Sequence, residues 1–214
     1  MATTLNNSGI VFPDATTQTT AATSGGDYVL RAYTSPATWT KPAGLKSVKV
    51  TVIGAGGEGG NIPPTIYGIS GGSGAGGGGA IKYVSAPVAP SSVSVTVGSG
   101  GSKTSSFGAF CSATGGVKGN NAPSPGLSAP SAIVAGGVGT GGDLNAPGQE
   151  TAGGSAGGTS AFGYGIGART FSRPTSSPGV QGTGYGAGSS GARGPGGRTG
   201  VDGTPGVVIV EEFY

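Results

Sequence analysis

The chain contains no histidine and one cysteine in 214 residues, and only 9 % of its residues are charged. One cysteine cannot form an intramolecular disulfide, and a zinc site built from cysteine and histidine ligands is excluded. Catalytic arrangements that use histidine as the general base are excluded as well. The eight acidic residues include one adjacent pair, Glu211 and Glu212. We therefore predict that the protein is not an enzyme and that it holds no metal ion and no cofactor.

Long apolar runs and strong charge are also missing. No stretch of about 18 apolar residues offers a membrane span, and the first residues lack the basic start of a signal peptide. The formal net charge of +3 is small for a protein that binds nucleic acid. Residues 54–59 match the glycine spacing of a dinucleotide-binding loop, but Pro63 and Pro64 follow where that loop needs a helix. We expect no nucleic-acid partner and no membrane insertion.

Glycine is the abundant residue, with 50 copies beside 15 prolines. Only four glycines precede residue 54, and the rest occur in blocks in which every third residue is often glycine. From Gly188 to Gly206 this three-residue period is strict. A period of three is typical of an extended left-handed helix whose amides must bond to neighbouring segments. A folded-back bundle, a collagen-like triple helix and a flexible linker all remain possible, and we favour the bundle.

Within that bundle, the run 188–206 is expected to form one helix of about 56 Å, from 18 steps of about 3.1 Å. Gly197, inside the run, is expected to have no room for a side chain because neighbouring backbones pack closely. Arg198, one residue later, is expected to point outward.

Short alternating apolar segments separate the glycine-rich blocks and predict β-strands at about 28–53, 80–97 and 207–214. Within the first of these segments, residues 39–44 are expected to form a turn between a strand at 28–33 and a strand at 45–53. The terminal strand 207–213 is predicted to pair with the strand 47–53, because an unpaired apolar edge invites aggregation. Cys111 lies among aromatic residues and is predicted to be a small buried apolar residue.

The predicted fold is therefore all-β with irregular structure. It combines a small antiparallel sheet or sandwich framework with a glycine-rich bundle of polyglycine-II-like three-residue helices, and it has essentially no α-helix. Two regions are expected: an N-terminal attachment and oligomerisation segment, residues 1–26, and a glycine-rich domain, residues 27–214. The glycine-rich blocks of that domain are residues 54–79 and 98–206.

The N-terminal segment is rich in threonine and alanine and contains one apolar group, Ile10, Val11 and Phe12. An apolar group this short cannot bury itself. We predict that it is buried against other chains in a homo-oligomer, with a threefold assembly as the leading choice, because closed rings hide such groups.

Three local patterns resemble tail fibre and receptor-binding adhesin proteins of tailed bacteriophages. The first is GIVFPDATTQTTA at residues 9–21, which is similar to a segment found near the start of phage fibre chains. The second is WTKPAG at 39–44 followed by VKVTVIGAGG at 48–57, which is similar to the opening of glycine-rich fibre-tip domains. The third joins VTVGSGG at 95–101, TSSFG at 104–108, SATGG at 112–116 and PGVVIV at 205–210. The order of these patterns spans nearly the whole chain.

The resemblance implies a virion component at the host-binding end of a tail fibre, made in the host cytoplasm. Its expected partners are other tail or baseplate proteins and a receptor on the bacterial surface, either a lipopolysaccharide or polysaccharide or an outer-membrane protein. In the T-even-like branch of these adhesins, loops between packed glycine helices touch the receptor. This chain departs from that branch because it is short and carries its own fibre-like N-terminal segment.

Side chains that could read a receptor are expected where the glycine-rich blocks are interrupted, at residues 62–69, 120–133, 143–150 and 161–180. Aromatic rings and guanidinium groups can bind sugars and exposed protein loops. The richest interruption supplies the leading candidates, Phe162, Tyr164, Arg169, Phe171 and Arg173. A second set is Ile66 and Tyr67. The alternative for each aromatic residue is that it covers the scaffold.

Two other functions remain open on the sequence. The first is a purely structural virion spacer or cement protein without a ligand. The second is an ice-binding protein, because flat bundles of glycine helices can present regular rows of side chains. The side chains of residues 188–206 form an irregular series, which disfavours ice binding.

Overall fold

The computed structural model describes residues 28–64, 70–86, 88–100, 103–122, 132–152, 156–168, 177–195 and 197–214, together with three short N-terminal strands. The described chain is all-β and has no α-helix; its one helical element is the 3-10 turn η1, Ala161–Gly163. The N-terminal strands β1 (Thr4–Asn6), β2 (Gly9–Val11) and β3 (Thr17–Gln18) form a small antiparallel sheet. Ile10 and Val11 lie in β2, whereas Phe12 lies outside the described residues.

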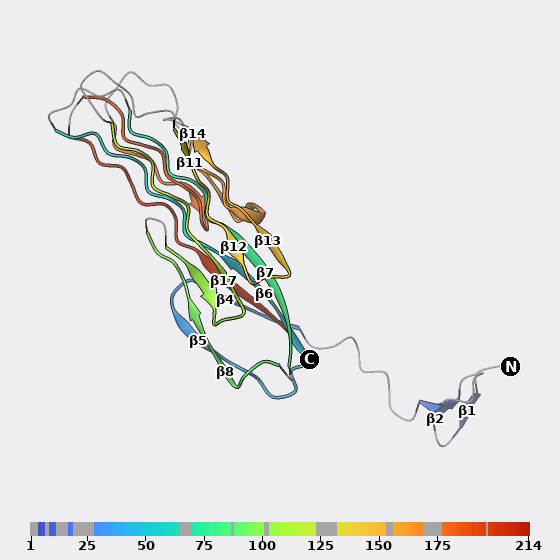
Figure 1. Cartoon of the computed structure of the whole chain (residues 1–214). Coiled ribbons are helices and arrows are strands. Elements are labelled where there is room, and N and C mark those ends of the chain that lie inside the picture. Colours follow the sequence, from blue (N-terminus) through green and yellow to red (C-terminus); the bar gives the residue numbers. More distant parts are fainter. Residues whose placement is uncertain are drawn as a thin grey trace.

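Two five-stranded antiparallel sheets form the base of the molecule (Figure 1). The first sheet has the order β13-β7-β6-β17-β4 and the second has the order β12-β10-β9-β8-β5. The strands of the first sheet are β4 (Tyr28–Tyr33), β6 (Ser47–Ile53), β7 (Gly79–Ser85), β13 (Leu144–Ala146) and β17 (Val207–Phe213). Those of the second are β5 (Ala37–Thr40), β8 (Ser92–Thr96), β9 (Ser105–Phe107), β10 (Cys111–Ala113) and β12 (Gly139–Thr140).

Two further strand pairs lie outside these sheets. Strand β11 (Ile133–Val134) pairs with β14 (Thr151–Ala152), and β15 (Gly165–Ile166) pairs with β16 (Thr183–Gly184). The predicted interruption at residues 143–150 contains a strand, because Leu144–Ala146 form β13, which pairs with β7 at the sheet edge.

The core lies between the two sheets, because alternate residues of the central strands are apolar and face inward. Val48, Val50 and Val52 of β6 are fully buried, as are Val208 and Val210 of β17. This alternation confirms the strands predicted for both segments.

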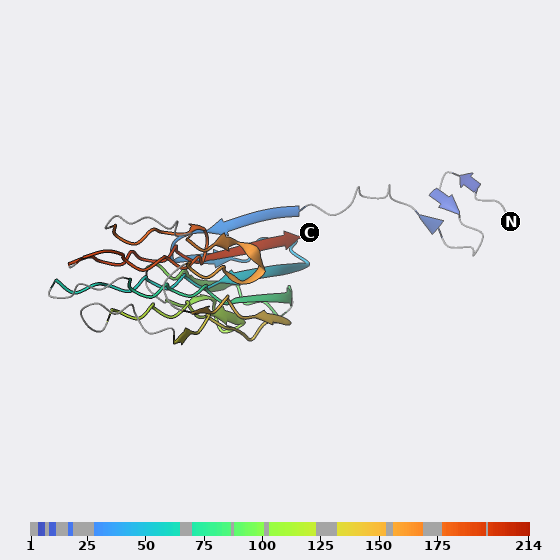
Figure 2. The same cartoon turned by 90° about the horizontal axis from the view of Figure 1, so that it is seen from above.

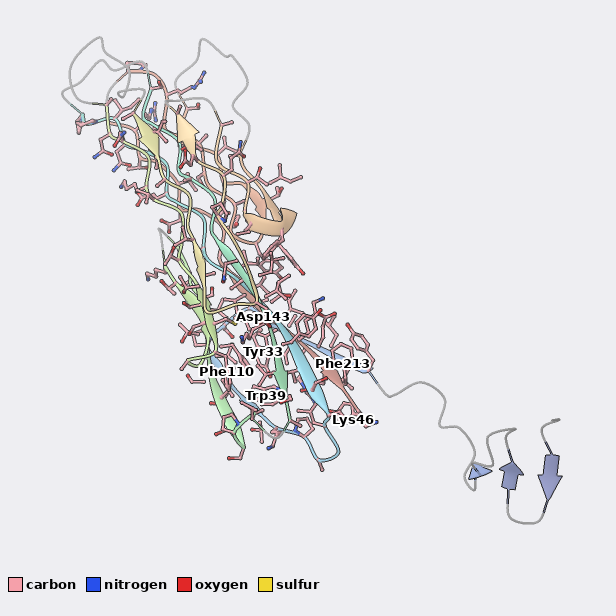
Figure 3. All side chains as sticks on the ribbon, turned by 45° about the vertical axis from the view of Figure 1, so that its right-hand side comes forward. Tyr33, Trp39, Lys46, Phe110, Asp143 and Phe213 are labelled. Atoms are coloured by element: carbon pink, nitrogen blue, oxygen red, sulfur yellow. The ribbon has the colours of Figure 1, made fainter. Side chains whose placement is uncertain are left out.

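The second sheet contributes aromatic side chains to the same core. The rings of Trp39 and Phe107 lie 5.5 Å apart between their centroids, and Phe110 packs against Phe107. Figure 3 shows Trp39 and Phe110 in the body of the sandwich. The turn predicted at residues 39–44 is shorter than expected: residues 43–44 form a turn, whereas Trp39 is buried in β5, which ends at Thr40. Cys111 is buried as predicted, and burial raises the pKa of its thiol to about 11.

The predicted pairing of β6 with β17, two strands far apart in the sequence, is confirmed. Strand β17 pairs antiparallel with β6 from Val207 opposite Ile53 to Phe213 opposite Ser47. On its other side β17 pairs with β4, so the last strand of the chain is an interior strand of its sheet. This pairing holds together the two ends of the glycine-rich region that lies between β6 and β17 in the sequence.

The glycine-rich segments leave the sheets and run side by side, as Figure 2 shows. Their lateral backbone hydrogen bonds repeat every three residues. Three amides of residues 54–60 donate to carbonyls of residues 72–78: Gly54 to Gly78, Gly57 to Ala75 and Gly60 to Gly72. Three others of residues 56–62 donate to a second neighbour: Gly56 to Thr204, Gly59 to Val201 and Ile62 to Arg198. One segment is thus bonded to several neighbours, each on a different side.

The spacing between these segments leaves no room for side chains at the glycines that meet a neighbour. A Cβ added at Gly57 would overlap the carbonyl of Val117, and one at Gly60 would overlap the carbonyl of Asn120. Glycine is therefore required here by close backbone approach.

Two expectations about the run 188–206 are wrong. The run does not form one helix, because the chain reverses within it: Ala187 and Thr204 are hydrogen-bonded across the reversal. Gly194 and Gly197 have φ of 97° and 68°, a conformation that favours glycine and that breaks the extended path. Gly197 also has room for a side chain, since a Cβ would lie 3.7 Å from its nearest neighbour, Pro64 Cα.

Candidate binding surface

The first sheet has one face in the core and one face turned away from the second sheet. Because side chains alternate along a strand, the residues next to the core valines point to this outer side. Strand pairing aligns Leu30, Glu211, Lys49 and Tyr83 in one row across four strands. The next row toward the chain end contains Tyr28 beside Phe213, with ring centroids 5.7 Å apart. Figure 3 shows Phe213 at the outer side of the sandwich.

Five aromatic side chains gather on this side, and we call them the outer aromatic face. Three come from the sheet and two from η1 and the residue after it: Tyr28, Tyr83, Phe213, Phe162 and Tyr164. Their exposed fractions run from 36 % for Phe213 to 60 % for Tyr83. Within the described ranges, no aromatic side chain elsewhere is as exposed as these five. Exposed rings gathered on one face mark a binding surface.

An ion pair lies in the middle of the outer aromatic face. Lys49 Nζ is 2.8 Å from Glu211 Oε2, and the hydroxyl of Tyr28 donates to Glu211 Oε1 over 3.1 Å. The hydrogen bond to Glu211 raises the pKa of Lys49, and the phenols of Tyr83 and Tyr164 lie close enough to add to that rise. The rings therefore surround one donor and one acceptor of opposite charge.

Phe162 is held in an unusual backbone conformation. Its φ is 55°, and it is the one non-glycine residue in the described chain with φ in the left-handed region. A Cβ at Gly79 of β7 would lie 2.6 Å from Phe162 Cε2, so the ring packs on the bare backbone of that glycine. Left-handed backbone at a non-glycine residue costs free energy and is concentrated at functional sites.

The structure places two of the predicted receptor-binding residues and brings them to the sheet. Tyr164 lies near Lys49, and the ring of Phe162 packs on Gly79 of β7, the strand that also carries Tyr83. Neither Lys49 nor Tyr83 was predicted from the sequence. Tyr83 occupies an outward position of an alternating strand, and that signal identifies it once the strand is recognised. The other predicted residues lie outside the described part of the chain: Arg169, Phe171, Arg173, Ile66 and Tyr67.

A hollow of about 390 Å³ is lined by residues of the edge strands β4 and β5 and of the segment that follows β5, among them Arg31, Trp39 and Lys41. Three of its polar side chains already bond to the protein itself. Arg31 and Trp39 both donate to the carboxylate of Glu212, and Lys41 Nζ donates to two backbone carbonyls. We therefore assign this hollow to the structural core of the sheets.

Among the described residues, no three histidine, cysteine, aspartate or glutamate side chains gather where they would hold a metal ion. The described part of the chain also has no helix long and apolar enough to cross a membrane.

Comparison with known proteins assigns no family to this arrangement. No family model matches the chain, and no curated protein sequence is significantly similar to it.

Proposed function

We propose that this protein is a bacteriophage tail fibre or fibre-tip protein that binds the surface of the host cell non-covalently. The observation that carries this proposal is the outer aromatic face, five exposed rings around an ion pair on a closely packed scaffold. The order of fibre-like sequence patterns along the chain supports the same function. A spacer without a ligand has no need for such a surface.

The scaffold is interpreted as a bundle of polyglycine II helices. Hydrogen bonds that return to the same neighbour every third residue support this interpretation, because that helix has three residues per turn and bonds only sideways. Each segment is fixed by several neighbours, so the bundle is stiff although it has few side chains. A stiff scaffold lowers the entropy cost of binding, because the binding groups are held in place beforehand.

The N-terminal segment, residues 1–26, would attach the protein to the virion. Its apolar residues Ile10, Val11 and Phe12 would be buried between three copies or against another tail protein. The host receptor would be a polysaccharide, a lipopolysaccharide or an outer-membrane protein. In this proposal the protein acts by binding alone and performs no catalysis.

The test is adsorption of the fluorescently labelled full chain to a panel of bacterial strains, read by flow cytometry. We expect that at least one strain is coated and that Tyr83→Ala combined with Tyr164→Ala lowers the coating ten-fold or more at an unchanged melting temperature. Ile133→Ala is the matched control, since Ile133 is an exposed residue of β11 outside the outer aromatic face. A protein that coats no strain, or a double variant that coats like the parent, contradicts the proposal.

A further inference from the structure

The outer aromatic face is broad and follows the sheet. The row from Leu30 to Tyr83 crosses four strands, which corresponds to about 14 Å from three interstrand spacings. Tyr28 and Phe213 widen the face along the strands by one further row. A surface of this extent contacts several units of an extended chain and is larger than one small molecule needs.

Its chemistry matches a sugar polymer. The ring faces of Tyr28, Tyr83 and Tyr164 are apolar, and the C–H faces of pyranose rings stack on such surfaces. Between them, Lys49 supplies a donor and Glu211 an acceptor 2.8 Å apart, which suits two adjacent hydroxyl groups of one sugar. The hydroxyls of Tyr83 and Tyr164 make no hydrogen bond within the described chain and can donate and accept.

The charges on the outer aromatic face favour a neutral ligand over an acidic one. Lys49 and Glu211 neutralise each other, and no other charged side chain occupies the row that they share with Leu30 and Tyr83. An acidic polymer would gain from an excess of Lys or Arg, which this face lacks, and its carboxylates would be repelled by Glu211. A neutral polymer meets no electrostatic repulsion here, because the paired Lys49 and Glu211 carry no net charge.

A second copy of the protein fits the face less well. The centre of a stable contact between proteins is depleted in charged residues. Here the ion pair occupies the centre and the rings surround it. Apart from Tyr28 and Phe213, the rings also come from separate positions along and across the strands and do not form one apolar cluster.

We infer that the outer aromatic face binds an extended neutral polysaccharide, with pyranose rings stacked on Tyr28, Tyr83 and Tyr164 and hydroxyls bonded to Lys49 and Glu211. This inference rests on the proposed function and names the class of its receptor. The stacking contacts contribute most of the affinity, and the ion pair selects the orientation of the sugars.

The test applies the full chain to an array of purified neutral and acidic bacterial polysaccharides at low salt and in 0.5 M NaCl. Binding to neutral polymers that is unchanged by salt supports the inference. Tyr83→Ala is expected to weaken the strongest of these interactions at least ten-fold by titration calorimetry, and Tyr83→Phe to weaken it about two-fold or less. Ile133→Ala is the control and is expected to bind like the parent.

Three results overturn the inference. The first is binding to acidic polymers only, lost in 0.5 M NaCl. The second is a silent array while the same protein coats bacteria, which leaves the proposed function standing. The third is a lower sedimentation coefficient for Tyr83→Ala than for the parent, which assigns the face to a contact between copies. A protein that binds neutral polymers on the array but coats no strain contradicts the proposed function, and then only the polysaccharide contact of the outer aromatic face stands.

Discussion

Trp39 Nε1 donates a 2.8 Å hydrogen bond to Oε1 of Glu212, a carboxylate with no exposed surface. Trp39 belongs to the second sheet and Glu212 to the first, so this bond joins the two layers. Arg31 Nε donates to the same oxygen over 2.8 Å, and the hydroxyl of Tyr214 donates to Oε2 over 2.9 Å. The buried charge is thus surrounded by three donors, one of them cationic. A carboxylate that is so well bonded stabilises the fold only while it stays ionised.

Replacement of Glu212 by glutamine is expected to lower the free energy of unfolding at pH 7 by about 1–3 kcal/mol, because charged hydrogen bonds to buried groups are lost. The matched control is Glu211→Gln, whose partly exposed ion pair contributes less than about 1 kcal/mol. Urea denaturation at pH 7 measures both variants. Equal losses in the two variants would contradict the role given to Glu212.

The same carboxylate predicts acid sensitivity. Burial alone raises the pKa of Glu212, but the hydrogen bonds from Arg31, Trp39 and Tyr214 outweigh it and hold the pKa below its usual value. Because the folded pKa is the lower one, the stabilisation is present above the unfolded pKa of about 4.3. It is lost as the pH falls through the folded pKa. Melting curves between pH 7 and pH 3 should therefore show a smaller acid-dependent loss in Glu212→Gln than in the parent.

The sequence predicted the elements whose cause is local. Val48, Val50 and Val52 alternate with polar residues, and this alternation was enough to predict β6. Its pairing with β17 was predicted because each apolar strand would otherwise leave an open edge. The three-residue glycine period likewise predicted lateral bonding of the glycine-rich segments. The reversal near Gly194 and Gly197 was missed, because a glycine that allows a turn and a glycine that allows close packing look alike in a sequence.

The candidate site was predicted only in part for a related reason. Phe162 and Tyr164 were selected as an aromatic group within one interruption. Tyr28 and Tyr83 join them only through strand pairing between segments that lie from 26 to 185 residues apart in the sequence. The residues around Tyr28 and Tyr83 do not show which distant strands will pair with theirs. The alternation along each strand does show that both side chains point outward.

The close packing of the glycine-rich segments predicts a large difference in unfolding free energy between substitutions at two neighbouring residues, Gly57 and Val117. Gly57→Ala should lower the free energy of unfolding by about 2 kcal/mol or more, because its Cβ would overlap the carbonyl of Val117 and overpacking is costly. Val117→Ala removes an exposed side chain from that same neighbour and should cost less than about 0.5 kcal/mol. Urea denaturation followed by circular dichroism compares them. Two equally mild variants would show that the segments are loosely packed.

The position of β17 predicts the result of a truncation. A chain that ends after Pro205 loses an interior strand and leaves β4 and β6 without their common partner. The valines of β6 would then lie beside an open sheet edge, which invites aggregation. We expect insoluble protein on expression, measured as the fraction in the pellet. A chain that ends after Phe213, and so lacks only Tyr214, is the control and should remain soluble. Soluble and protease-resistant protein from the shorter chain would contradict the role of β17 as the closing strand.

The N-terminal segment predicts a separation of assembly from folding. The two large sheets and the glycine-rich segments are built from residues after 27, so deletion of residues 1–24 should leave their melting temperature within about 2 °C of the parent. If the proposed trimer forms through Ile10, Val11 and Phe12, the deletion should also convert it into a monomer, because it removes this apolar group. Sedimentation velocity measures the change. Serine at these three positions in the full-length chain is the matched control and should give the same monomer, since it removes the apolar contacts and keeps the length. Two results would show that these residues do not hold copies together. One is a full-length chain that sediments as a monomer, and the other is a shortened chain that sediments with the same number of copies as the full-length chain.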